Sequence, residues 1–149
     1  MPRLHVNVDH VATLRQARRE AFPDPVEWAQ RVERAGAQGI TCHLRKDRRH
    51  IQDADVANLR RSIRTLLNLE CSLDSEMVTF ALRSGAEAFC LVPETRQEVT
   101  TEGGLDAAGQ LAALKETRQR MNDGGIEVSL FIAPDPVQVD ASMAIGAQF

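Results

Sequence analysis

Aromatic residues are scarce in this sequence, and long apolar runs are missing. Only 4% of the 149 residues are aromatic, and none is tyrosine. No stretch without charged residues is long enough to cross a bilayer, and the N-terminus MPRLHVNVDH lacks the apolar core of a signal peptide. We therefore expect no membrane span and a cytoplasmic location.

An excess of positive charge is also missing. The chain has 18 Lys and Arg against 21 Asp and Glu, a formal net charge of -3, so no overall positive field draws it to nucleic acid or to an anionic membrane. Its basic run at 45–50 has no interleaved aromatic residues on which bases could stack. We expect no nucleic-acid partner, and any bound anion must be held by a local group of side chains.

Cysteine is present, but not in a metal-binding pattern. Cys42, Cys71 and Cys90 are odd in number, widely spaced and without a Cys-x-x-Cys pair. Each stands among apolar or strand-like neighbours. We interpret them as reduced core residues and expect no metal site.

Short apolar runs rich in Val, Ile and Leu recur along the chain and alternate with segments of helical spacing. The runs lie at 4–9, 39–44, 66–71, 88–92 and 127–132. Apolar residues three and four positions apart predict helices around 28–35, 56–63 and 105–114. Strands that alternate with helices indicate parallel pairing through right-handed crossovers. We therefore predict one α/β domain over residues 1–149.

Several of these runs end in polar residues at alternate positions, which lie on one face of a strand. This pattern favours a barrel over a doubly wound sheet. Strands of a doubly wound sheet are buried on both faces and are nearly continuous in apolar residues. Here the same-face polar pairs are Asn7 with Asp9, His43 with Arg45, and Asn68 with Glu70. Such a pattern is typical of strands that line a barrel mouth. We predict the N-terminal portion of a TIM (β/α)₈ barrel, truncated after about five βα units.

The polar pairs stand at the carboxyl ends of their strands, where such barrels carry their active sites. An imidazole titrates near neutrality, and a carboxylate in a closed site holds its proton more tightly than in water. His43 and Glu70 are therefore candidates for proton transfer, with Asp9 and Arg45 on the same rim. For any one of them the alternative is a strand-end residue bonded to a neighbouring loop, or a core histidine in the case of His43.

Three segments could hold phosphate. The run Arg45-Lys46-Asp47-Arg48-Arg49-His50 has five cationic or titratable basic side chains, and Arg15-x-x-Arg18 offers a second cationic grip. The long connection at 92–106 includes Thr100, Thr101 and Gly103-Gly104, and long loops at a barrel mouth often act as lids. The alternatives are a solvated basic loop, surface charge and a simple glycine turn.

Four phrases carry a resemblance to a known family: VNVDHVATLR (6–15), HLRKDRRHI (43–51), NLE (68–70), and VPE through QEVTTEGGLD (92–106). In these phrases, and over nearly its whole length, the sequence resembles the pyridoxine 5′-phosphate synthase family. The resemblance implies a (β/α)₈ barrel enzyme of vitamin B6 biosynthesis. It would condense 3-amino-2-oxopropyl phosphate with 1-deoxy-D-xylulose 5-phosphate to give pyridoxine 5′-phosphate, phosphate and water. It further implies no metal or organic cofactor, and homo-oligomers that are commonly octamers.

The resemblance also implies roles for individual residues. His43 and Glu70 would be proton acceptors, while Asn7 and Arg18 would contact the amino-ketone substrate, 3-amino-2-oxopropyl phosphate. The residues implied to contact the deoxyxylulose phosphate are Asp9, His10, Arg45, His50 and Thr100.

Two alternatives stay open. One is a non-catalytic barrel fragment that retains part of a phosphosugar site, and the other is a different phosphosugar lyase or isomerase, because fold alone does not specify chemistry. The chain also departs from the family where Arg18-Arg19 replaces Arg-Gly and Phe22 replaces a tyrosine before Pro-Asp-Pro. It ends at Phe149, where a sixth strand is expected, so we expect the 149-residue polypeptide alone to be inactive.

Overall fold

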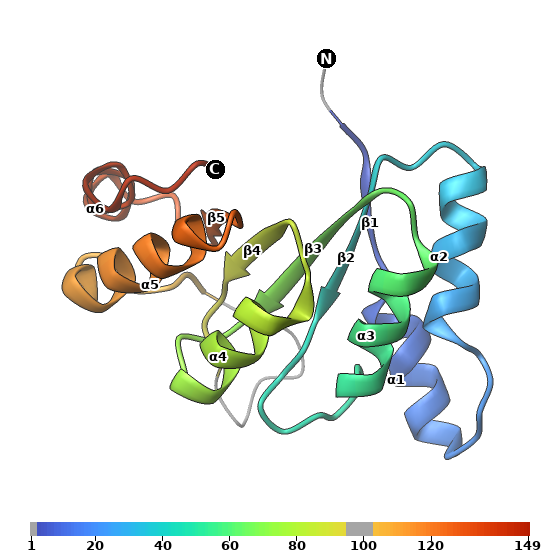
Figure 1. Ribbon diagram of the computed structural model, residues 1–149. Helices are drawn as coiled ribbons and strands as arrows, with labels where there is room; N and C mark the ends of the chain where they lie inside the picture. Colours follow the sequence, from blue (N-terminus) through green and yellow to red (C-terminus); the bar gives the residue numbers. More distant parts are fainter. Residues whose placement is uncertain (1–2, 95–102) are drawn as a thin grey trace.

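A computed structural model describes residues 3–94 and 103–149 of the chain (Figure 1). Strands and helices alternate along most of it. The strands are β1 (His5–Asn7), β2 (Gly39–His43), β3 (Leu66–Cys71), β4 (Ala88–Leu91) and β5 (Glu127–Leu130). The helices are α1 (Asp9–Arg18), α2 (Pro25–Arg34), α3 (Asp53–Ser62), α4 (Ser75–Ser84), α5 (Leu111–Asp123) and α6 (Pro136–Ile145).

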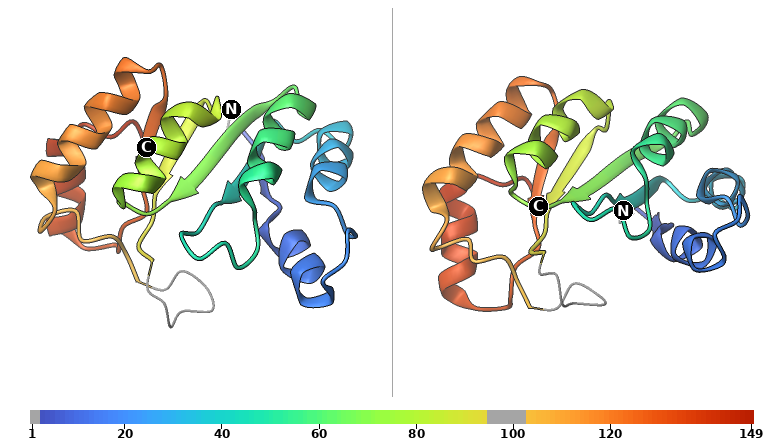
Figure 2. Two further views of the ribbon diagram at one scale, coloured as in Figure 1. Left: turned by 60° about the horizontal axis from the view of Figure 1, so that its bottom comes forward. Right: turned by 90° about the horizontal axis from the view of Figure 1, so that it is seen from below.

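The five strands form one parallel sheet in the order β1-β2-β3-β4-β5. Each crossover therefore steps to the next strand in the same direction, and right-handed crossovers of that kind place their helices on one face of the sheet. Seen along the strands, the helices follow the sheet as an arc from α1 and α2 at one end to α6 at the other (Figure 2). The predicted parallel α/β architecture is confirmed.

Strand β3 shows how the sheet divides its side chains between two faces. Leu67, Leu69 and Cys71 are fully buried, whereas Asn68 and Glu70 between them are partly exposed. The buried side chains of β3 belong to the same apolar core as the inner faces of the helices, which include Leu59 of α3, Met77 of α4 and Leu114 of α5. Removing this apolar area from water stabilises the sheet by about 25 cal/mol per Å².

The three cysteines are free and buried, as predicted. Burial raises the pKa of Cys90 to about 11, although a hydrogen bond with Ser129 opposes this. Burial likewise raises the pKa of Cys42 and of Cys71. All three thiols therefore stay protonated near neutral pH, which makes them poor nucleophiles and poor metal ligands. In the part of the chain that is described, no helix combines the length and the apolarity needed to span a membrane.

Two element boundaries differ from those expected. The first strand was expected to reach residue 9, but Asp9 is the first residue of α1. The backbone N–H of Asp9 donates a hydrogen bond to the side-chain oxygen of Asn7 (2.8 Å), which turns the chain at the end of β1. The helix expected from residue 105 begins only at Leu111. Leu105 is buried instead by docking beside the end of β5, where its N–H donates to the Phe131 carbonyl (2.7 Å).

Gly104 owes its place to this docking. A Cβ atom at this position would lie 2.0 Å from the backbone nitrogen of Ala133. Because Gly104 has no side chain, its backbone can lie against the backbone of Ala133. This supports the interpretation of Gly103-Gly104 as a turn rather than as a phosphate loop.

Arg15 joins α1 to α3 through a bidentate ion pair with Asp55. Its two terminal nitrogens each lie 2.7 Å from an Asp55 oxygen, and the two side chains are only 11% and 9% exposed. Arg15 also donates to the His50 carbonyl (3.3 Å), and Asp55 accepts from the Gln52 N–H (2.8 Å). Arg15 therefore anchors the loop after β2 and does not form the phosphate grip suggested by its spacing from Arg18.

Removing one partner of this buried pair leaves the other charge uncompensated. We expect Asp55→Asn to lower the free energy of unfolding by about 3–5 kcal/mol, measured by urea denaturation of the complete protein that contains this chain. The matched control is Asp53→Asn in the same helical turn, whose exposed pair with Arg48 is worth about 1 kcal/mol or less. Equal losses in both variants would contradict a structural role for the Arg15–Asp55 pair.

Candidate active site

Asp9 ties the carboxyl ends of β1 and β2 together. Its Oδ1 accepts a hydrogen bond from the backbone N–H of His43 (2.7 Å), and its Oδ2 accepts one from the Asn7 side chain (2.7 Å). The Asp9 residue is only 7% exposed. A buried carboxylate held by two donors has one fixed orientation, so Asn7, Asp9 and His43 form a rigid unit at the strand ends.

Glu70 completes this unit from the neighbouring strand. It pairs with His43 in the register of β2 and β3, and one ligand-type atom from each of Asp9, His43 and Glu70 lies within 4.8 Å of the others. The structure thus brings together both predicted proton-transfer residues and two of the predicted substrate-binding residues. It does so because parallel strands end at the same edge of a sheet.

The environment of Glu70 suits proton transfer near neutral pH. Burial and the adjacent Asp9 carboxylate raise the pKa of Glu70, while His43 opposes the rise. A raised pKa brings a carboxyl closer to the operating pH, which is the condition for efficient general acid–base catalysis.

Glu94, which follows β4, has no assigned role in the sequence analysis, yet it contacts the centre of the cluster. Its Oε1 lies 2.9 Å from His43 Nε2, and its Oε2 accepts from the Lys46 backbone N–H (3.1 Å). Burial would raise the pKa of Glu94, but the hydrogen bonds from His43 and Lys46 and the charge of Arg45 lower it overall. The signal that points to this residue is its place in the VPE phrase just after a strand end.

His50 and Arg45 lie beside the cluster on the loop after β2. The His50 ring centroid is 5.8 Å from that of His43, and the Ile51 N–H donates to His50 Nδ1 (2.8 Å). Burial lowers the pKa of His50. The carboxylates of Asp9 and Asp47 oppose this change, and the charges of His43 and Arg45 reinforce it. In the neutral ring the proton is on Nε2, because Nδ1 accepts from the Ile51 N–H, so this tautomer can donate one hydrogen bond to an anion.

Much of the basic run after β2 is engaged with carboxylates rather than exposed to solvent as free charge. The pairs are Lys46 with Asp74, Arg48 with Asp53 and Glu76, and Arg49 with Asp47. Arg45 is buried and lines a cavity of about 470 Å³ together with Ser72 and Glu94. These carboxylates compensate much of the positive charge of the loop. Arg45, at the cavity wall, also contacts Asp47, with its Nε 3.4 Å from the Asp47 Oδ1.

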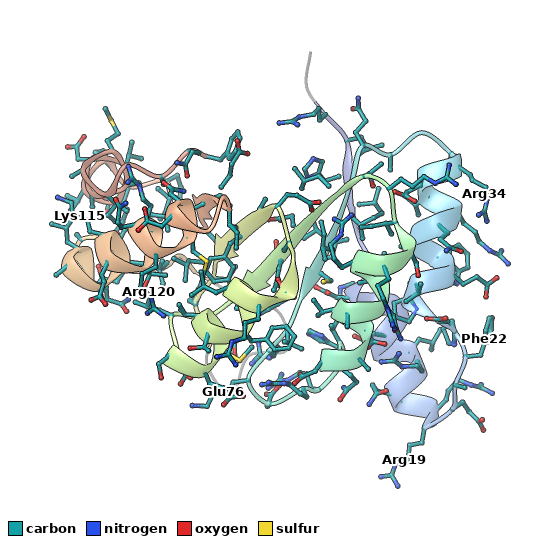
Figure 3. All side chains as sticks on the ribbon, viewed as in Figure 1. Arg19, Phe22, Arg34, Glu76, Lys115 and Arg120 are labelled. Carbon is teal, nitrogen blue, oxygen red and sulfur yellow. The ribbon has the colours of Figure 1, made fainter. Side chains whose placement is uncertain are left out.

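His10 and Arg18 lie apart from this cluster. Both are exposed and line a groove of about 960 Å³ between α1 and α2, together with Leu14, Phe22 and Trp28. Phe22 is 64% exposed and projects away from the sheet (Figure 3). Among the described residues, neither His10 nor Arg18 forms a hydrogen bond or ion pair with the cluster. Thr100, the remaining predicted ligand, lies outside the described residues.

The trio of Asp9, His43 and Glu70 is close enough to hold a cation. Both Asp9 oxygens, however, already accept protein hydrogen bonds, and His43 Nε2 contacts Glu94. The expected absence of a metal remains a prediction, and the hydrogen bonding favours proton transfer as the use of these groups.

Comparison with known proteins identifies the family. A family model described as "Pyridoxal phosphate biosynthesis protein PdxJ" matches residues 4–149. The chain belongs to this family. It is 57% identical over 146 residues to a pyridoxine 5′-phosphate synthase of Photobacterium profundum, and 56% identical over 147 residues to that of Coxiella burnetii. These matches cover 98% and 99% of the chain but 60% and 61% of the relatives, so the chain spans about three fifths of their length.

A solved structure of more distant sequence supports the fold of this PdxJ family chain. A mandelate oxidase variant with benzaldehyde matches 83% of the chain and 43% of its own, with a TM-score of 0.61 and 17% identity. At that identity the likeness concerns the parallel α/β fold alone.

The contribution of Asp9 to the proton affinity of Glu70 can be measured directly. We expect Asp9→Asn to lower the pKa of Glu70 towards its ordinary value, because the substitution removes a neighbouring negative charge. Carbon-13 NMR titration of the glutamate carboxyl groups would detect this in the complete protein. Asp123→Asn on α5 is the control and leaves the Glu70 titration unchanged. An unaltered pKa in the Asp9 variant would show that burial alone raises it.

Proposed function

We propose that the complete protein containing this chain is a pyridoxine 5′-phosphate synthase. It would condense 3-amino-2-oxopropyl phosphate with 1-deoxy-D-xylulose 5-phosphate to give pyridoxine 5′-phosphate, phosphate and water. The observation that carries the proposal is the cluster of Asp9, His43 and Glu70 at one strand edge, in a chain that belongs to the PdxJ family. Relatives of the same name support it.

The cluster fits the chemistry that a ring closure of this type needs. Imine formation between the amine and the ketone is followed by removal of protons from carbon, and each removal needs a positioned base. Glu70, with its raised pKa, and His43 are two such groups on adjacent strands. We assign them the role of proton acceptors, and we assign no metal or organic cofactor.

The complete fold that we propose is a single-domain (β/α)₈ barrel. Over residues 3–94 and 103–149, the helices lie on one face of the sequentially ordered sheet and leave the other face without helices. Further βα units of the same kind would bring the last strand back to β1. Closure would turn the polar parity, including Asn68 and Glu70, into the lining of an enclosed mouth. Exclusion of water from such a mouth strengthens every electrostatic interaction within it.

The proposed ligands are the two phosphorylated substrates and further copies of the protein. Arg45, His50, Asp9, His10 and Thr100 would contact 1-deoxy-D-xylulose 5-phosphate. Arg18 and Asn7 would bind the amino-ketone phosphate. The proposed assembly is a homo-oligomer, an octamer by family resemblance.

Substitution of the proposed base tests the reaction. Glu70→Gln preserves size but removes the proton acceptor, so we expect kcat to fall by about 10²- to 10⁴-fold in an assay of product from the two substrates. Glu116→Gln, at an exposed site on α5, is the matched control. Near-normal turnover of the Glu70 variant would reject the assigned role. A wild-type protein that forms no product would reject the synthase and favour another phosphosugar lyase or isomerase.

The two arginines should not be redundant, because they lie in different parts of the molecule and the reaction joins two phosphates. We expect Arg45→Ala to weaken binding of the deoxyxylulose phosphate and Arg18→Ala to weaken binding of the amino-ketone phosphate. Each loss should be about 1.5–3 kcal/mol for a charge-assisted contact, measured by calorimetry with each substrate separately. Equal losses for both ligands in each variant would contradict this division.

A further inference from the structure

We infer that Glu94 is a positioning residue for His43, holding its ring in the tautomer whose Nδ1 accepts a proton during catalysis. The catalytic part of this inference, the proton transfer to His43, rests on the proposed function. The hydrogen bond that carries it is a feature of the described structure: Glu94 Oε1 lies 2.9 Å from His43 Nε2.

The ionisation state of Glu94 determines which ring nitrogen carries the proton. Hydrogen bonds from His43 and from the Lys46 N–H, with the nearby charge of Arg45, lower the pKa of this carboxyl despite its burial. An ionised carboxylate can only accept hydrogen bonds. His43 Nε2 must therefore be the N–H donor in this pair, and in the neutral ring Nδ1 is then the unprotonated nitrogen, able to take a proton.

The geometry leaves little freedom for another arrangement. The side chains of His43 and Glu94 are 5% and 8% exposed, so water competes weakly for their hydrogen bond. The second Glu94 oxygen is held by the N–H of Lys46 (3.1 Å), three residues after the end of β2. The backbone N–H of His43 is held in turn by Asp9 (2.7 Å). Ring and carboxylate are thus fixed from two strands, β2 and the end of β4.

The remaining charged groups around His43 do not offer the same contact. Asp9 and Glu70 approach the ring from the start of α1 and from β3, but both Asp9 oxygens are already engaged by backbone and Asn7 donors. Arg45 and His50 lie on the following loop and have no carboxylate to offer the ring. Glu94 is the carboxylate among them that reaches a ring nitrogen at hydrogen-bond distance in the described structure. A carboxylate that orients a histidine base and fixes its tautomer is an established catalytic arrangement.

The direct test is nitrogen-15 NMR of histidine-labelled complete protein, wild type beside Glu94→Gln. We expect the neutral His43 of the wild type to have a protonated Nε2 and an unprotonated Nδ1. The glutamine side chain can donate as well as accept, so the variant should show a mixture of tautomers or the reversed one. A wild-type His43 with its proton on Nδ1 would overturn the inference, whether or not the protein proves to be a synthase.

Kinetics test the consequence. We expect Glu94→Gln to lower kcat by about 10²- to 10⁴-fold with KM for either substrate changed less than about threefold, because the effect is on proton transfer rather than on binding. Glu94→Asp keeps the charge at shorter reach and should recover part of kcat. Glu27→Gln, in an exposed pair on α2, is the control and stays at wild-type activity. Wild-type tautomer and kcat in the glutamine variant would refute the positioning role.

Should the glutamine variant fail to fold, the aspartate variant and the wild-type spectrum still decide the matter. A loss of activity that appears only as raised KM would also count against the inference. If the wild type lacks synthase activity while its His43 shows the expected tautomer, the proposed reaction fails and the Glu94–His43 contact stands.

Discussion

Hydrogen-bonded pairing of five consecutive parallel strands is the constraint on which the rest of the molecule depends. Parallel strands in sequential order end at one edge, and the register of β2 and β3 sets His43 beside Glu70 there. Right-handed crossovers in one direction place the helices on one face. The apolar side chains on one face of the sheet pack against those helices. The polar side chains point to the other face, where the candidate catalytic residues lie.

Electrostatics then give different properties to carboxylates that surround a single imidazole. Glu70 has a raised pKa, because burial and the Asp9 charge outweigh the opposing effect of His43. Glu94 is also buried, but donors on both oxygens lower its pKa. Groups whose environments separate their proton affinities in this way can divide acid, base and orienting roles between them.

The loop after β2 is held by ion pairs that connect three helices. Arg15 of α1 grips Asp55 at the start of α3, and Arg48 reaches both Asp53 of α3 and Glu76 of α4. The loss of side-chain entropy in these contacts occurs when the protein folds. The segment that contains Arg45 and His50 is therefore already ordered before a ligand binds. Preorganisation of this kind reduces the free energy lost on binding.

The sequence by itself determined the order of the elements, the parity of their side chains and the strand-end placement of Asp9, His43 and Glu70. These follow from local periodicity and from the rule that parallel strands share an edge. Tertiary structure alone decided that Arg15 pairs with Asp55 and that Glu94 contacts His43, because these partners lie 40 and 51 positions apart. It also decided that residue 105 docks beside β5 instead of starting a helix. Contacts at such separations depend on how the elements pack, and no local pattern specifies them.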